Sequence, residues 1–540
     1  MFKGIKQHVA GVALALSVAS LIFAAGAPAG HGQGAAEATR PLTPQERLGK
    51  SLYLRGSSPT GREITATVGE VEVPATTLTC AGCHGAKGLG KTEGGVTAGE
   101  LTWAHLTKPS GHAHPSGRKH GPFGEAAFAR AVADGIDPDG NELTAAMPRY
   151  RMSPEDTAAL VAYLKRIASD RDPGLSDDRM RVGTSLPSAG PLAETGAAMK
   201  DVLVAYFDEL NSRGGIHNRK IELRVADAGA DAAAASANAR RLIRDEQVFA
   251  MLGGITAGAD AEMAALARDE EIPFVGPSTL WPQTGPPLNR YVFYLLPGVA
   301  EQARALVNFA AGRPEMSKSR VALVYPEGGI AATAAAAVEA QIRESGGPPP
   351  AKHAHARGNF DAAQVVRRLK QEGAGVVYFL GASGDDLKFI NEAAAAEWTP
   401  NVFLLGVLTA RNLPSGVPAT FKGKVFLSFP SVPADITPAG LAEFRALQEK
   451  YKFAPRHAAS QLAALAAAKV FVEGIKLAGR DVTRENLVTA LEGLYNFETG
   501  LTPRLTFGPN RRVGASGAYV LTIDPEKGEY VPAGGWIKAD

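Results

Sequence analysis

Two cysteines and a histidine lie together as Cys80-Ala81-Gly82-Cys83-His84, the pattern C-x-x-C-H. In this pattern both thiols add to the vinyl groups of one haem, and the adjacent imidazole ligates the iron from one face. A redox-active dithiol is the competing interpretation, but it expects a βαβ pattern, whereas Gly- and Lys-rich sequence follows here. The chain has 2 cysteines in all, which excludes a disulfide framework. We therefore predict one covalently attached haem c, held by Cys80, Cys83 and His84.

The sixth ligand of the iron must approach from the opposite face, and we predict that it is Met147. This residue lies in Ala146-Met147-Pro148-Arg149-Tyr150, where the proline holds the preceding methionine extended and favours a rigid loop. A thioether ligand raises the reduction potential relative to a second histidine. Other residues stay open as alternative ligands: Met152, His105, His112, His114 and His120.

Two helices with clear starting residues must position this site. Thr43-Pro44-Gln45-Glu46 is a capping box with proline at the first helical position, and Ser153-Pro154-Glu155-Asp156 starts a later helix in the same way. Gly49 and Tyr53 share one face of the first helix. A crossing of the two helices at a glycine would close the domain. The apolar stripe of the later helix comprises Leu160, Tyr163, Leu164 and Ile167.

Three segments in this part carry a family resemblance: CAGCH, DGIDPDGNEL and AMPRYRMSPED. With the capped helices, they resemble the class I cytochromes c over residues 41–169. The resemblance implies an all-α domain that carries one electron at a time. It also implies that Cys80 and Cys83 attach the haem, and that His84 and Met147 are its axial ligands. A six-coordinate iron leaves no open position for catalysis, so we expect no enzymatic activity there.

The N-terminus indicates export. Lys3 and Lys6 precede an apolar run over residues 9–25, and Ala27-Pro28-Ala29 fits an A-x-A cleavage pattern. We therefore predict a signal peptide at 1–29 and a periplasmic mature protein, with a retained membrane anchor as the alternative. The chain has 57 Lys and Arg against 55 Asp and Glu, so its net charge of +2 offers no basic surplus for nucleic acid.

The length of 540 residues predicts about three to four domains. A small, polar tether at 30–40 precedes the cytochrome-like domain at 41–169, and residues 170–179 carry proline, glycine and alternating charge, which suits a linker. From residue 180 onward, strand patterns alternate with helical ones, which predicts a parallel α/β sheet covered on both faces. The predicted strands begin at Val182 and Ile221 and continue at 248–252, 273–275, 321–325, 376–380, 402–405 and 425–429.

Four stretches of this second part carry another resemblance: ELNSRGGIHNRKIELRVAD, MLGGITAGADAEMAALARDEEIPFVGPST, YVFYLLPG and LAGRDVTRENLVTALEGL. They resemble the type I periplasmic binding proteins of the branched-chain amino-acid family. The resemblance covers residues 180–540 and implies two Rossmann-like lobes that clamp a small organic ligand between them. It places lobe 1 at about 180–297 and 431–500, and lobe 2 at about 298–430 and 501–540. The crossovers would lie near Pro297, near Pro430 and around 500–507.

Ligand contacts in that family fall on loops that follow strands, at the carboxyl ends of the sheet. By position, the resemblance implies these ligand-binding residues: Thr256, Ala257, Gly258, Ser278, Thr279, Trp281, Tyr325 and Ser383. Hydroxyls and backbone N–H groups in such loops suit a carboxylate or amide oxygen, and Trp281 would give an apolar wall. The chain departs from the family at Gly328-Gly329, where amino-acid binders usually carry an acidic or Tyr-Gly element. A less charged molecule, or an aromatic or aliphatic acid, suits the site as well as an amino acid does.

No P-loop, G-x-S-x-G or H-E-x-x-H motif is present, so phosphoryl transfer, hydrolysis and zinc catalysis have no support in the sequence. We predict a non-enzymatic, periplasmic electron-transfer protein whose haem is coupled to a domain that binds a small organic solute. Its redox partner would be a periplasmic dehydrogenase or another cytochrome. Two alternatives stay open. One is the solute-binding component of an ABC-type uptake system, which serves a permease and carries an accessory haem. The other is a docking module without a ligand.

Overall fold

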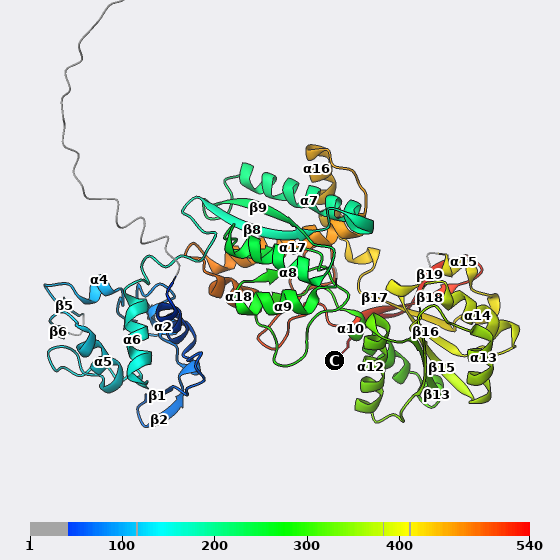
Figure 1. Ribbon diagram of the computed structural model, residues 1–540, viewed down its shortest axis with the longest axis horizontal. Helices are drawn as coiled ribbons and strands as arrows, with labels where there is room; N and C mark the ends of the chain where they lie inside the picture. The colour runs from blue at the N-terminus through cyan, green and yellow to red at the C-terminus, as the bar shows by residue number, and fades with distance from the viewer. Residues whose placement is uncertain (1–41, 115–116, 257, 382, 410–411, 540) are drawn as a thin grey trace, which may run out of the picture. The chain divides into compact units, whose positions relative to one another are not determined.

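The computed structural model describes residues 42–539 except 115–116, 257, 382 and 410–411 (Figure 1). The predicted signal peptide at 1–29 and tether at 30–40 lie outside the described residues. The chain divides into two compact units, one ending at Asp170 and the other beginning at Arg171. Unit 1 holds the C-x-x-C-H motif, and unit 2 holds the α/β part of the chain.

Unit 1 is a small, mainly helical domain. Its helices are α2 (Pro44–Arg55), α3 (Cys80–His84), α4 (Trp103–Leu106), α5 (Glu125–Asp134) and α6 (Pro154–Leu164). The sequence did not predict its short strands. An antiparallel sheet in the order β2-β1-β7 contains β1 (Thr65–Val68), β2 (Val71–Pro74) and β7 (Arg149–Arg151). Two hairpins pair β3 (Lys91–Glu93) with β4 (Val96–Ala98) and β5 (His112–Ala113) with β6 (Lys119–His120).

The first and last helices of unit 1 cross at a glycine, as predicted. α2 begins at the capping box, in which Thr43 Oγ1 accepts a hydrogen bond from Glu46 N at 3.2 Å. A Cβ placed on Gly49 would lie 2.0 Å from the backbone oxygen of Ala159 in α6. Only glycine permits so close an approach. The two helices contribute much of the apolar core of the unit.

The first lobe of unit 2 is a 5-stranded parallel sheet in the order β12-β11-β10-β8-β9. Its strands are β8 (Arg179–Leu186), β9 (Lys220–Asp227), β10 (Ala250–Leu252), β11 (Phe274–Val275) and β12 (Val292–Phe293). Its helices are α7 (Ala193–Ser212), α8 (Ala232–Arg244), α9 (Asp260–Asp269), α16 (Pro438–Tyr451), α17 (Ala458–Ala478) and α18 (Arg484–Glu492) (Figure 1). Among the described residues, α17 is long and apolar enough to cross a membrane, but most of it is buried in the core of this lobe.

The second lobe contains a 7-stranded sheet in the order β14-β13-β15-β16-β17-β18-β19. Its strands are β13 (Arg320–Pro326), β14 (Ala351–His355), β15 (Ala374–Phe379), β16 (Asn401–Leu405), β17 (Val425–Phe429), β18 (Ala518–Asp524) and β19 (Glu529–Ile537). Its helices are α10 (Val299–Ala311), α11 (Pro314–Ser317), α12 (Gly329–Glu344), α13 (Ala362–Gln371), α14 (Asp385–Ala395) and α15 (Leu413–Gly416). The predicted parallel sheet is correct as far as β17. It is wrong beyond that strand, because β18 and β19 form a hairpin and run antiparallel.

The chain passes between the lobes three times. The first two passages follow β12 and β17, in the regions of Pro297 and Pro430. The third is predicted around 500–507, and this prediction is wrong. Apolar side chains at 501, 505 and 507 are buried in the first-lobe core, and Val513 still pairs with Tyr294 beside β12. The third passage therefore follows residue 515, directly before β18, because packing holds an irregular segment in the first lobe.

Candidate functional site

The C-x-x-C-H motif forms a short helix of its own, α3. Thr79 caps this helix, since its Oγ1 accepts a hydrogen bond from Gly82 N at 3.1 Å. Residues three apart on a helix share one face, so the turn presents Cys80 and Cys83 together. Cys80 is half-buried, Cys83 is exposed, and both are free thiols. Two thiols on one face of one turn fit attachment to a single porphyrin edge.

The orientation of His84 fits an axial ligand. The residue is 8% exposed, and its Nδ1 lies 2.7 Å from the backbone oxygen of Gly99. Because a carbonyl oxygen only accepts hydrogen bonds, Nδ1 carries the ring proton and the Nε2 lone pair is left for a metal. Burial lowers the pKa of His84, although the contact with Gly99 opposes this. A neutral imidazole is the form that binds metals, so the residues of α3 fit haem c.

The surroundings of Cys80 argue against a redox-active dithiol. Burial raises the pKa of the Cys80 thiol to about 12, and hydrogen bonds, including one with Tyr150, only partly offset the effect. A redox-active dithiol needs a thiolate whose pKa is lowered, and Cys80 does not supply it.

The segment around Met147 is tied to the residues that precede α3. Arg149 donates hydrogen bonds to the backbone oxygens of Met147 and Leu143, the latter at 3.0 Å. Tyr150 Oη donates to Leu78 O at 2.6 Å, two residues before Cys80. Met147 is half-buried against the core of unit 1, and so is Met152. This arrangement fits Met147 as the sixth ligand, and the choice between the two methionines stays a prediction.

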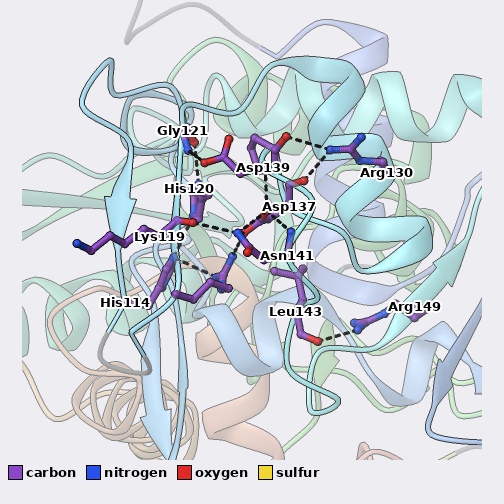
Figure 2. A network of polar contacts seen from close by, with 12 residues as sticks. His114, Lys119, His120, Gly121, Arg130, Asp137, Asp139, Asn141, Leu143 and Arg149 are labelled. Atoms are coloured by element: carbon purple, nitrogen blue, oxygen red, sulfur yellow. Dashed lines mark hydrogen bonds and ion pairs between the residues drawn. The ribbon is translucent and has the colours of Figure 1, made fainter.

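A buried carboxylate holds the loop that precedes Met147 (Figure 2). Asp137 is fully buried, and Arg118 Nη1 donates to its Oδ2 at 2.7 Å. Asn141 Nδ2 donates to the same oxygen and to Lys119 O in β6, each at 3.0 Å. These contacts fasten residues 137–141 to the β5–β6 hairpin. Figure 2 shows this network meeting the side chains of His114 and His120.

The histidines that stay open as alternative ligands lie next to one another. The rings of His105 and His112 stack at 4.3 Å between centroids. His114 Nε2 lies 3.0 Å from His120 Nε2, and His120 Nδ1 lies 2.7 Å from Gly121 O. No set of three or more His, Cys, Asp or Glu side chains in the described part of the chain is arranged to hold a metal ion. The four rings therefore contact each other and the hairpin.

The predicted first-lobe ligand residues lie on two loops that follow neighbouring strands. The loop after β10 and the loop after β11 are joined by an Ile255–Ser278 bridge, in which Ser278 N donates to Gly254 O at 2.8 Å. Since β10 and β11 are parallel, both loops lie at the carboxyl edge of the sheet. The structure therefore brings this part of the predicted set together.

The exposure of these residues differs. Ser278, Trp281 and Gly258 are exposed, Thr279 is half-buried, and Thr256 is buried. Ala257 lies outside the described residues. The predicted second-lobe residues follow paired strands, with half-buried Tyr325 at the end of β13 and exposed Ser383 beyond β15.

Asp260 is a residue of this site that the sequence analysis missed. It is the first residue of α9 and is 8% exposed. Thr256 Oγ1 donates a hydrogen bond to Asp260 Oδ1 at 2.6 Å, and Thr279 Oγ1 donates to the same oxygen. The available signal was an acidic residue directly after the predicted loop. Its partner Thr279 lies on another loop, which the local sequence does not reveal.

Comparison with protein families agrees with both predicted resemblances. Residues 179–529 match the family described as periplasmic binding protein, and residues 74–168 match the family described as cytochrome c. Leu/Ile/Val-binding protein homolog 7 of Brucella suis is 25% identical over 317 residues, which are 56% of this chain and 78% of that protein. Leu/Ile/Val-binding protein homolog 3 of Brucella melitensis is 26% identical over 204 residues, 37% of this chain and 54% of that protein.

Solved structures share the fold of unit 2. A putative branched-chain amino acid ABC transporter protein from Rhodospirillum rubrum has a TM-score of 0.53 at 20% identity, and the match covers 66% of this chain and 99% of that chain. A fatty acid ABC transporter substrate-binding protein from Thermomonospora curvata has a TM-score of 0.52 at 17% identity, covering 68% and 95%. A branched-chain amino acid ABC transporter protein from Thermus thermophilus with bound valine has a TM-score of 0.52 at 18% identity, covering 67% and 97%.

Proposed function

The chain belongs to the periplasmic binding protein family and also carries a cytochrome c domain, and from this premise we propose that it couples electron transfer to the binding of a small organic solute. The observation that carries the proposal is the presence of both modules in one polypeptide, with α3 in unit 1 and the two-lobed fold in unit 2. Binding proteins of this family imply an exported or periplasmic protein. A signal peptide at 1–29 and domains at 41–169 and 180–540 are part of the proposal.

Named residues of unit 1 would hold the cofactor. We propose that Cys80 and Cys83 bind one haem c covalently, and that His84 Nε2 and Met147 ligate its iron. Such a group supplies one-electron transfer when bound. The chain contributes the tautomer of His84, set by Gly99, and the fastening of the segment that contains Met147.

The redox partner is proposed to be a periplasmic dehydrogenase whose substrate or product is the solute bound by unit 2, or another cytochrome. Electron transfer between unit 1 and its redox partner would then depend on whether unit 2 has bound that molecule. Nothing in this role requires catalysis by the chain itself, and the relatives of unit 2 are named as binding proteins.

The test is a ligand screen by thermal unfolding, run on the oxidised and the reduced holoprotein side by side. A ligand that binds the folded state raises the unfolding midpoint. We expect one ligand whose affinity differs between the two redox states, because a coupling free energy between two sites acts on both. Equal affinity in both states overturns the coupling and leaves two independent modules.

A second candidate function is solute uptake through an ABC-type permease, with the haem as an accessory. The names of the relatives favour this candidate, since they are Leu/Ile/Val-binding proteins. Deletion of the gene would then abolish uptake of the bound solute, whereas an electron-transfer role predicts loss of solute-dependent respiration instead. Failure of every probe to bind would favour the docking module.

A further inference from the structure

We infer that the first lobe of the cleft selects a ligand group that donates hydrogen bonds or carries positive charge, and not a carboxylate. The two threonines that were predicted to meet the ligand both point their hydroxyl protons at Asp260. This inference deepens the proposed function and rests on it, because it takes the cleft of unit 2 as the binding site.

The hydroxyl protons of Thr256 and Thr279 are already used in hydrogen bonds within the protein. A threonine hydroxyl has one proton to donate, and an ionised carboxylate has none. Thr256 and Thr279 each donate to Asp260 Oδ1, and Thr279 Oγ1 already accepts a hydrogen bond from Trp281 N at 2.8 Å. The side chains of Thr256, Thr279 and Asp260 therefore present acceptors, whereas the exposed Ser278 keeps a hydroxyl proton. A ligand carboxylate would meet lone pairs at these three side chains, whereas an N–H or O–H group would find partners.

Asp260 also lacks a cationic partner among the described residues. Buried carboxylates are normally paired, because an uncompensated charge away from water is costly. Within the described residues, Asp260 forms no ion pair with lysine, arginine or histidine. Burial raises the pKa of nearby Tyr294 to about 12, and the charges of Asp260 and Glu301 add to the effect against an opposing hydrogen bond from Gln283 N. Asp260 therefore contributes negative charge at this edge of the first-lobe sheet, which suits a cationic or donor group.

A purely structural role is the alternative. Asp260 starts α9, and a carboxylate is favourable at the start of any helix. It also fastens the loop after β10 to the loop after β11 through the two threonines. Such a role predicts that Asp260→Asn lowers stability without changing which class of ligand is preferred. Ligand preference is therefore the readout that separates the two roles.

The test is calorimetric titration of the full-length holoprotein with 4-methylpentylamine, 4-methylpentanamide and 4-methylpentanoate, which share one branched carbon skeleton. We expect the amine or the amide to bind more tightly than the carboxylate. Asp260→Asn keeps the shape of the side chain, and we expect it to weaken amine binding about 10- to 100-fold, the loss of one charge-assisted hydrogen bond. The matched control is Asp269→Asn at the far, exposed end of α9, which should leave all affinities unchanged.

The outcomes separate the inference from the proposed function. Tightest binding of the carboxylate to the wild-type protein overturns the inference and leaves a ligand-binding function intact, and this comparison needs no variant to fold. Unchanged amine affinity in a folded Asp260→Asn protein also overturns it. Failure of all three probes counts against the ligand-binding function itself, and the inference is overturned with it.

Discussion

Gly49→Ala adds one methyl group at the crossing of α2 and α6. The new Cβ would lie 2.0 Å from the backbone oxygen of Ala159 and 2.7 Å from Tyr163 Cβ, well inside the contact distance of about 3.5 Å. The nearest of these atoms belong to the backbone and cannot rotate away, so the helices must separate. Overpacking of this kind costs about 1–3 kcal/mol, whereas alanine in an unobstructed helix stabilises by about 1 kcal/mol relative to glycine. The crossing therefore predicts a loss of stability, opposite in sign to helix propensity.

Urea unfolding of the holoprotein, followed through the visible absorbance of the haem, measures the stability of unit 1. Gly124→Ala is the control, since no atom lies within 4 Å of its added Cβ. We expect the control to change the free energy of unfolding by about 1 kcal/mol or less. A Gly49→Ala protein that is more stable than the wild type would refute the packing of α2 on α6 at this glycine.

Two further predictions concern the haem ligand and acid stability. Met147→Ala should abolish the charge-transfer band of methionine-ligated ferric haem and lower the reduction potential. Met152→Ala should leave the band in place. The reverse result would show that Met152, and not Met147, is the ligand. Hydrogen bonds from Lys450 and Arg213 lower the pKa of Glu209 to about 2. The stability that the Glu209 carboxylate contributes is therefore fully present above pH 4.5, the ordinary pKa of glutamate. It is lost as the pH falls towards about 2. Glu209→Gln should make the thermal midpoint fall less over this interval, and an unchanged slope would contradict the assignment.

The sequence revealed the features of this protein that are local. The haem motif, the capping boxes and the buried strands such as β10 and β17 are set by neighbouring residues, so pattern and spacing were sufficient. The hairpin of β18 and β19 was missed, because β18 mixes buried and half-buried positions, β19 has only half-buried and exposed ones, and neither pattern predicts a particular partner. The third lobe crossing was misplaced because residues such as Leu505 stay in the first lobe through packing, which no local pattern encodes.

The same limit applies to the candidate sites. The tautomer of His84 depends on Gly99, which lies 15 residues away in the chain. The two threonines of the cleft were identified from their position after strands, and their commitment to Asp260 depends on a contact between two loops. The sequence therefore predicted candidate residues for both sites, but not which of their protons take part in hydrogen bonds within the protein. The proposed preference of the first lobe for a donor group rests on that difference.

The connection between the two units is shorter than the predicted linker at 170–179. Asp170 is held in unit 1, where Lys50 Nζ lies 2.8 Å from its Oδ2 and Tyr163 Oη donates to the same oxygen at 3.1 Å. Asp172 is held in unit 2, where its Oδ2 accepts a hydrogen bond from Arg484 N at 2.5 Å. Arg171 is therefore the single residue between the last anchor of unit 1 and the first anchor of unit 2.

A coupling that is carried by the chain must then pass through Arg171, which makes it open to a specific test. Insertion of Gly-Ser-Gly-Ser between Asp170 and Arg171 leaves both anchors intact and places a flexible segment between them. We expect the ratio of ligand affinities between the oxidised and reduced protein to fall towards one, because coupling requires a shared element with two states. The same insertion in the exposed turn at Glu526, between β18 and β19, should leave the ratio unchanged. If the ratio survives insertion after Asp170, the coupling acts across space, since the two redox states differ in charge and a charge acts through solvent without a covalent path.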